Sequence, residues 1–217
     1  MSGILSLVSY LRDNCAEDVV SSASTYLSRE ADWAVLTLEA IDTLSDRDFF
    51  ANAARVLVPN VQPRVFPIYV DEIGFSVVVN HYNRSDYERS FDAGFITPHM
   101  HHFSFVSRVL FGKFCEYRFD NSGSKLNPSL KPAAAVWRRA GDVYTLGFDT
   151  YHCIVAPEHN TTTLLVRSAP VFVNPHINAD GYTMRDSLRE RGELLRSLER
   201  AVDQAQSCVK SARGDQA

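Results

Sequence analysis

The chain has 217 residues, with a hydrophobic fraction of 45% and a charged fraction of 22%, values that are ordinary for a globular protein with a sizeable core. Its net charge of -4 and isoelectric point of about 6.0 give it no overall basic field that would attract nucleic acid. We therefore expect no nucleic-acid partner.

The N-terminal sequence lacks the basic region and cleavage site of a signal peptide, and no apolar run reaches the roughly 18 residues of a membrane span. The four cysteines, at positions 15, 115, 153 and 208, show no CxxC spacing. Unpatterned cysteines in a chain of this size fit a reducing compartment better than a disulfide framework. We expect a cytoplasmic protein that does not bind membranes.

Residues 1–60 are predicted to be helical. Ile4, Leu7, Val8 and Leu11 recur at the spacing of one helix face. A second amphipathic segment begins near Trp33, and the polar residues 45–48 are typical of the cap of a third helix. We expect this region to pack on the outside of the domain that follows.

Residues 61–180 are predicted to form a β-barrel. Short segments rich in β-branched and aromatic residues are separated by Asn, Asp, Gly, Pro and Ser. These segments are 66–70, 75–79, 103–119, 135–137, 143–146, 154–155 and 162–166. Because antiparallel sheets must manage their edges, strands at this spacing favour a closed barrel or a jelly roll.

Residues 181–217 are predicted to form a long helix and a tail. Apolar residues between Met184 and Val209 follow steps of three and four, interspersed with Arg and Glu. Such a helix packs its apolar stripe either on the barrel or on a second subunit, so a homodimer is one of the two options.

Two histidine signals about fifty residues apart predict a metal site. His99 and His101 are two residues apart, so in an extended chain their side chains share a face and can chelate together. His152 lies on a later strand or just before one, and the return of the chain in a barrel could bring it opposite the pair. A neutral imidazole suits Fe, Cu, Ni, Zn and Mn, so the ligand type does not select the metal. Whether His102 or His81 also contributes stays open.

The first histidine signal resembles the first motif of the cupin superfamily, G-x5-H-x-H-x3-4-E-x6-G. Gly94, His99, His101 and Gly112 fit this motif with one residue fewer after the first glycine. The resemblance implies a mainly β fold, a cupin jelly-roll barrel, here with N-terminal helices and a long C-terminal helix.

The second signal resembles the second cupin motif, G-x5-P-x-G-x2-H-x3-N. Gly141 and His152 stand at the spacing of the family, whereas Gly147, Asp149 and Ala156 replace the proline, the second glycine and the asparagine. The resemblance covers residues 64–173, about half of the chain. It implies that His99, His101 and His152 are the metal ligands.

One departure from the cupin pattern is the missing carboxylate of the first motif. Phe105 stands near its expected position, and no Asp or Glu occurs between His99 and Lys113. A centre with three neutral ligands keeps the full +2 charge of the metal, which favours anionic ligands such as a thiolate or a carboxylate. In the superfamily, three-histidine iron sites are typical of thiol dioxygenases.

Residues 105–114 are also similar to the strand after the histidine pair in cysteamine and plant cysteine dioxygenases. The Tyr-Asp-Trp sequence that usually follows in those enzymes is absent, and residues 117–120 read Tyr-Arg-Phe-Asp. This difference leaves the substrate open.

The resemblance implies a mononuclear non-heme iron(II) oxygenase that uses dioxygen on a small polar substrate, with thiol dioxygenation to a sulfinate as one such reaction. Fe(2+) is the favoured cofactor, while Zn, Ni, Mn and Cu stay open. One alternative is a cupin isomerase, lyase or hydrolase in which the metal is a Lewis acid. Another is a non-catalytic, ligand-binding cupin.

Four further residues are candidates for the site. Tyr144 and Tyr151 flank the second motif and would either hydrogen-bond a bound oxygen species or pack as ordinary aromatic residues. Arg167 interrupts an apolar strand and would either bind a substrate carboxylate inside the barrel or face solvent. Asp149 would either orient a ligand imidazole or serve as a turn residue.

Overall fold

The computed structural model describes residues 3–14, 18–29, 31–54, 63–72, 74–94, 96–170 and 184–214. It contains six helices and eight strands within these ranges. The helices are α1 (Gly3–Asn14), α2 (Val19–Leu27), α3 (Trp33–Thr43), α4 (Asp46–Ala54), α5 (Arg84–Asp92) and α6 (Met184–Gly214). The strands are β1 (Arg64–Val70), β2 (Ser76–Tyr82), β3 (Phe105–Phe111), β4 (Lys113–Asn121), β5 (Leu130–Arg139), β6 (Val143–Leu146), β7 (Tyr151–Val155) and β8 (Thr161–Arg167).

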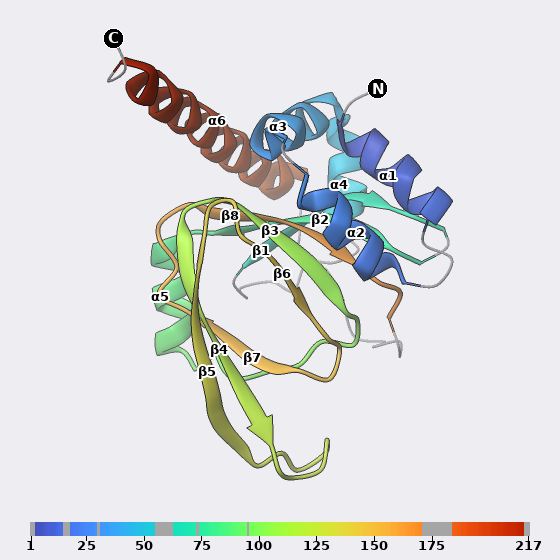
Figure 1. Cartoon of the computed structure of the whole chain (residues 1–217), viewed down its shortest axis with the longest axis vertical. Helices are drawn as coiled ribbons and strands as arrows, with labels where there is room; N and C mark the ends of the chain where they lie inside the picture. Colours follow the sequence, from blue (N-terminus) through green and yellow to red (C-terminus); the bar gives the residue numbers. More distant parts are fainter. Residues whose placement is uncertain are drawn as a thin grey trace.

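The strands form two antiparallel sheets that face each other. The larger sheet has the order β1-β2-β8-β3-β6 and the smaller one β5-β4-β7. Strand β8 inserts between β2 and β3, and β7 leaves the larger sheet to pair with β4, which is the crossing pattern of a jelly roll. Figure 1 shows the barrel with α1–α4 and α6 gathered on one side. The predicted jelly-roll barrel with helices at both ends is confirmed.

The larger sheet separates two hydrophobic cores, because successive strand residues point to opposite faces. On β2, Val77 and Val79 point out toward the helices, and Val78 points into the barrel. The outer core includes Leu7, Leu11, Leu27, Ile41, Leu194 and Leu198 of the helices. The barrel interior includes Phe105, Val109, Phe114, Tyr144, Leu146 and Leu165. Helices α1–α4 thus pack on the outer face of the larger sheet.

One helix was not expected from the sequence, and another was expected only as part of the helical N-terminal region. Helix α2 is a short segment between the first two predicted helices. Helix α5 lies inside the segment predicted as barrel, and it has no apolar stripe because only Tyr87 and Ser90 of its residues are buried. Its sequence signal is Asn83, whose side chain accepts hydrogen bonds from the backbone N–H groups of Ser85 and Asp86.

The segment 103–119 divides at Gly112 into β3 and β4. Gly112 has a φ of 75°, and a Cβ there would lie 2.4 Å from Oγ1 of Thr161, so both the backbone conformation and the space require glycine. Strand β4 then runs with β5 into a long hairpin that projects beyond the rest of the barrel (Figure 1).

Helix α6 is the longest helix, and residues 171–183, which join it to the barrel, lie outside the described residues. The predicted boundary between barrel and C-terminal helix therefore stays a prediction. No helix in the described ranges combines the length and the apolar character needed to cross a membrane. Cys115 and Cys153 are free and buried, and Cys15 lies outside the described residues.

Candidate metal centre

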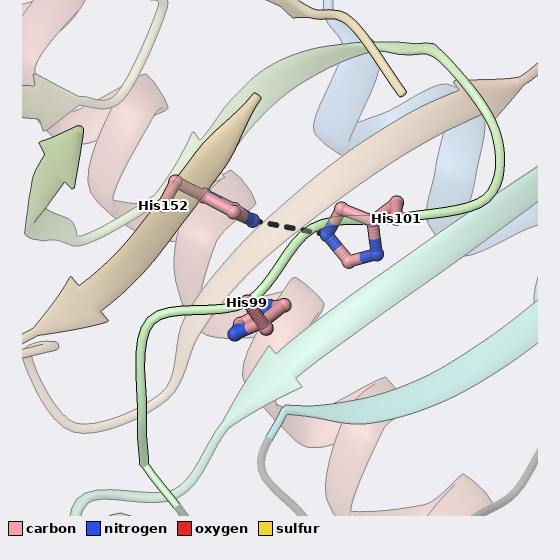
Figure 2. Close-up of side chains that lie close together, drawn as sticks. All are labelled: His99, His101 and His152. Carbon is pink, nitrogen blue, oxygen red and sulfur yellow. Dashed lines mark hydrogen bonds between the residues drawn. The ribbon is translucent and has the colours of Figure 1, made fainter. Parts of the chain in front are cut away.

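The three histidines predicted as metal ligands lie together at one end of the barrel. Each of His99, His101 and His152 offers a ring nitrogen, and these nitrogens all lie within 4.8 Å of one another. Figure 2 shows the rings of His101 and His152 facing each other, with the ring of His99 beside them. No other group of three or more His, Cys, Asp or Glu side chains with metal-binding spacing occurs among the described residues.

The backbone brings the two histidine signals together through a single bridge. The N–H of His99 donates to the carbonyl of His152, and the N–H of His152 donates to the carbonyl of His99, both at 2.9 Å. The bridge does not extend into a ladder because the N–H of Thr150, the next partner toward the turn, already donates to the carbonyl of Gly147. His99 and His101 thus lie on an extended segment before β3.

The geometry of the nitrogens fits a divalent metal. Nε2 of His101 and Nε2 of His152 are 3.0 Å apart. Two nitrogens that are each about 2.1 Å from one metal ion and at right angles to each other would be roughly 3.0 Å apart. The centroid of the His99 ring lies 5.1 Å from that of His101 and 4.8 Å from that of His152. The cluster therefore has the size of a three-histidine coordination face.

The Nε2 atom of His99 is left available by a hydrogen bond on the other side of the ring. Its Nδ1 donates to the carbonyl oxygen of Thr97 at 2.9 Å. Because a carbonyl oxygen only accepts, this contact places the proton on Nδ1 and the lone pair on Nε2.

His152 has a corresponding partner, the buried carboxylate of Glu116 on β4. Oε1 of Glu116 lies 3.7 Å from Nδ1 of His152, which is an ion-pair distance longer than a hydrogen bond. Oε2 accepts from Nε and Nη2 of Arg138 at 3.0 and 2.8 Å and from Nη2 of Arg118 at 3.3 Å. Desolvation raises the pKa of Glu116, but His152, Arg138 and Arg118 outweigh it and lower that pKa to about 2.

The sequence did not identify Glu116 as the residue that orients a ligand imidazole; the candidate for that role was Asp149. Asp149 is exposed, in the turn between β6 and β7, so the structure favours the turn alternative for it. The available signal was alternation along β4, which places Glu116 on the same inward face as the core residue Phe114. A lone carboxylate on such a face, beside a histidine strand, is a candidate for orienting an imidazole.

Burial keeps His101 neutral. Desolvation first, and then the neighbouring His152 and His99, lower the pKa of His101 to about 2. Desolvation and His152 also lower the pKa of His99, although that residue retains exposed surface. Neutral imidazoles have the free lone pairs that a metal requires.

An aromatic and cationic wall lines the cluster on the side of the larger sheet. The ring of Phe103 stacks on His101 with centroids 5.0 Å apart, and Phe105 meets His101 edge-on at 5.4 Å. Cζ of Arg167 lies 4.7 Å from the centroid of the Phe103 ring. Burial lowers the pKa of Arg167 to about 10, which leaves the guanidinium charged at neutral pH. Arg167 thus faces the inside of the barrel. This is the first of the two alternatives that its sequence context left open, the other being a side chain that faces solvent.

The two predicted tyrosines lie in different positions. Tyr144 is buried in the barrel, where its ring contacts Phe105 at 6.2 Å and the guanidinium of Arg138 at 4.4 Å. Phe105 in turn contacts the ligand histidines, so Tyr144 reaches the centre through that ring. Tyr151 directly precedes His152 on β7, and strand alternation places it on the opposite face of the small sheet.

The two additional histidines do not belong to the cluster. His81 lies on β2 on the same outward face as Val77 and Val79, and it is buried on the helix side of the larger sheet. The ring of His102 packs edge-on against Phe103 at 5.1 Å.

Comparisons with known proteins point to loosely similar folds. No protein-family profile and no curated protein sequence matches the chain. Similar solved structures include KdgF from Halomonas sp., with 17% identity, a TM-score of 0.33, and coverage of 50% of this chain and 83% of that chain. An oxalate decarboxylase from Bacillus subtilis described with Mn(II) centres has 16% identity, a TM-score of 0.31, and coverage of 47% and 23%.

A third similar structure is vicilin from hazelnut, Corylus avellana, with 14% identity, a TM-score of 0.36, and coverage of 64% of this chain and 39% of that chain. KdgF and oxalate decarboxylase are cupins. At these TM-scores the similarities identify neither a family nor an activity for this chain.

Proposed function

We propose that the chain is a mononuclear non-heme iron(II) oxygenase that acts on a small polar substrate, with thiol dioxygenation to a sulfinate as the reaction to test first. The observation that carries this proposal is the convergence of His99, His101 and His152 without a carboxylate ligand. The expected carboxylate position is occupied by Phe105, whose ring packs against His101.

A donor set of three neutral imidazoles favours this chemistry because it leaves the charge of the ion uncompensated. Bound ferrous iron would supply dioxygen activation and an attachment point for a thiolate or carboxylate of the substrate. Thr97 and Glu116 hold the rings of His99 and His152, and such partners of ligand histidines tune both affinity and orientation. Phe103 and Phe105 exclude water beside His101.

Of the predicted catalytic residues, Arg167 has the clearest role in the proposal, because its guanidinium faces the barrel beside Phe103 and would bind an acidic group of the substrate. For the tyrosines, the proposal rests on Tyr144 rather than Tyr151. Tyr144 lies inside the barrel against Phe105, whereas Tyr151 is on the opposite face of β7 from His152.

Oxygen consumption tests the proposal directly. Iron(II)-reconstituted protein is screened on an oxygen electrode with small thiols and amino acids, alongside His152→Ala. We expect substrate-dependent uptake in the wild type and none above background in the variant. Uptake that is unchanged in His152→Ala would refute the proposal, and turnover that persists without oxygen would select the Lewis-acid alternative, in which Zn, Ni or Mn serves instead.

A further inference from the structure

We infer that the site takes a small dicarboxylic acid, whose two carboxylates bind Arg167 and Arg118 on opposite sides of the histidine cluster. This inference rests on the proposed function and narrows its substrate class. The two arginines come from different sheets, and the histidines lie between them.

Arg167, at the end of β8, is a half-buried cation that has no counterion among the described residues. It pairs with Phe105 of β3, and directly paired residues share a face, so its side chain lies on the inner face of the larger sheet. Its Nε is buried and has no hydrogen-bond acceptor. Arg167 forms no ion pair within the described part of the chain. An enclosed guanidinium with free donors is a site for a carboxylate.

Arg118, on β4, occupies the corresponding position on the smaller sheet. Its backbone partner in the ladder is His152, so the two side chains lie on the same face. Its Nε is also buried without an acceptor. Among the described residues, its one ion-pair contact is the 3.3 Å approach of Nη2 to Glu116, which already accepts two shorter hydrogen bonds from Arg138. Glu116 thus carries one negative charge against the two positive charges of Arg138 and Arg118, which leaves one positive charge in excess.

The charge balance at the centre is the reverse of that of the whole chain. The chain has a net charge of -4, yet Arg118, Arg138 and Arg167 face the barrel here against the single buried carboxylate of Glu116. The nearby Asp149 is exposed in its turn. A metal ion on three neutral imidazoles would add further positive charge. Two negative groups on the ligand would pair with both arginines, whereas a single acidic group would leave one half-buried cation without a partner.

The long hairpin of β4 and β5 extends the smaller sheet past the cluster. Arg118 lies near its base, and at its far end Nζ of Lys125 lies 5.3 Å from the centroid of Phe148, in the turn that leads to β7. This contact ties the hairpin to the rim of the site. The hairpin thus carries Arg118 and Lys125, whereas Arg167 belongs to the other sheet, so a ligand that pairs with cations of both sheets needs two separate acidic groups.

Calorimetric titration of the metal-loaded chain tests the inference. The probes are malonate, succinate and glutarate, with butyrate and inorganic phosphate for comparison, at constant ionic strength. We expect one dicarboxylate to bind at least about tenfold more tightly than butyrate or phosphate, since each charge-assisted contact is typically worth that factor or more. Arg167→Met and Arg118→Met should each weaken this binding about tenfold or more, and the matched control Arg139→Met, an exposed residue on β5, should leave it unchanged.

The outcomes separate the inference from the proposed function. If the protein binds metal but shows no preference for dicarboxylates, or if phosphate binds equally well, the inference is wrong and the oxygenase proposal stands. If Arg167→Met weakens binding and a folded Arg118→Met does not, the two-arginine site is refuted. Arg118→Lys keeps the charge but not the paired donors of the guanidinium, and it replaces Arg118→Met if that variant fails to fold. An unchanged dicarboxylate affinity in Arg118→Lys would then refute the two-arginine site. Absence of metal binding would instead refute the proposed function.

Discussion

Nδ1 of His152 faces Oε1 of Glu116 at 3.7 Å, although neither atom has a hydrogen-bond partner among the described residues. The carboxylate is held from its other oxygen by Arg138, so its position does not depend on the histidine. This relationship orients the imidazole with Nε2 toward His101, which is the direction that the metal site requires.

Glu116→Gln should weaken metal binding by about 10- to 100-fold, the usual effect of removing a partner that orients a ligand histidine. The amide keeps the size of the side chain but removes the negative charge that faces Nδ1. Competition titration with a chelating indicator measures the affinity. The control is Glu158→Gln, because Glu158 is exposed and pairs with Lys113 at 3.1 Å. Equal affinities for both variants would show that Glu116 does not orient His152.

His101→Ala should abolish the thermal stabilisation that metal confers, because the cluster loses a central ligand. In the wild type, metal at about 100 times its dissociation constant should stabilise the fold by about 2.7 kcal/mol. His102→Ala is the matched control, since the neighbouring ring lies outside the cluster. Differential scanning calorimetry with and without metal measures this stabilisation in the wild type and in both variants. A metal response retained in His101→Ala and lost in His102→Ala would mean that the ligands are assigned wrongly.

His81 should make the fold sensitive to acid independently of the metal centre. Desolvation, and then the charge of Arg64, lower its pKa from 6.5 to about 4. The unfolded chain therefore binds this proton more readily, so the stabilisation is present above pH 6.5 and is lost as the pH falls toward 4. The loss should be roughly 3 kcal/mol.

Urea unfolding from pH 7 to pH 4 measures this effect as the difference between the wild type and His81→Phe. Because both proteins contain the same ligand histidines, the contribution of those histidines to the pH dependence cancels in this difference. We expect the stability of His81→Phe to fall less steeply with acid. Parallel curves for the two proteins would contradict the assignment to His81.

Arg191 should hold α6 against the C-terminal end of α3. Its Nη2 donates to the carbonyls of Ile41, Asp42 and Leu44 at 2.9, 3.2 and 2.8 Å, and its Nη1 pairs with Asp46. Arg191→Met should cost about 2 kcal/mol, because it leaves helix-end carbonyls without a donor.

The control for Arg191 is the exposed Arg196 on the same helix. Urea unfolding should show a loss for Arg191→Met and almost none for Arg196→Met, with metal affinity unchanged in both variants. Equal stabilities would mean that packing of α6 alone, through residues such as Leu194 and Leu198, holds the helix.

The barrel and the histidine cluster could be predicted because their signals are local in the sequence. Consecutive β-branched and apolar residues define β2 and β8, which are buried on both faces. His99 and His101, at a spacing of two, needed only an extended backbone to share a direction. Their proximity to His152 could be expected from the order of the two motifs along the chain. His99 pairs with His152 through a single bridge, and the spacing of two still directs His99 and His101 toward the same site.

Other features could not be predicted because they depend on pairing between distant segments. Glu116 faces His152 only because β4 pairs with β7 in one register, and a shift by one residue would turn its side chain outward. The same register places Arg118 beside the cluster. Helix α5 was hidden because it is polar and buries little, so that a cap residue, Asn83, was its main sequence signal.

Metal content tests the central claim most directly. The wild-type chain and a His99→Ala/His152→Ala double variant are purified without affinity-tag metals, reconstituted anaerobically with iron(II), desalted, and analysed by plasma mass spectrometry. The account predicts near one iron per wild-type chain and almost none in the variant. Equal metal in the two proteins, or none in either, would contradict a metal centre formed by His99, His101 and His152.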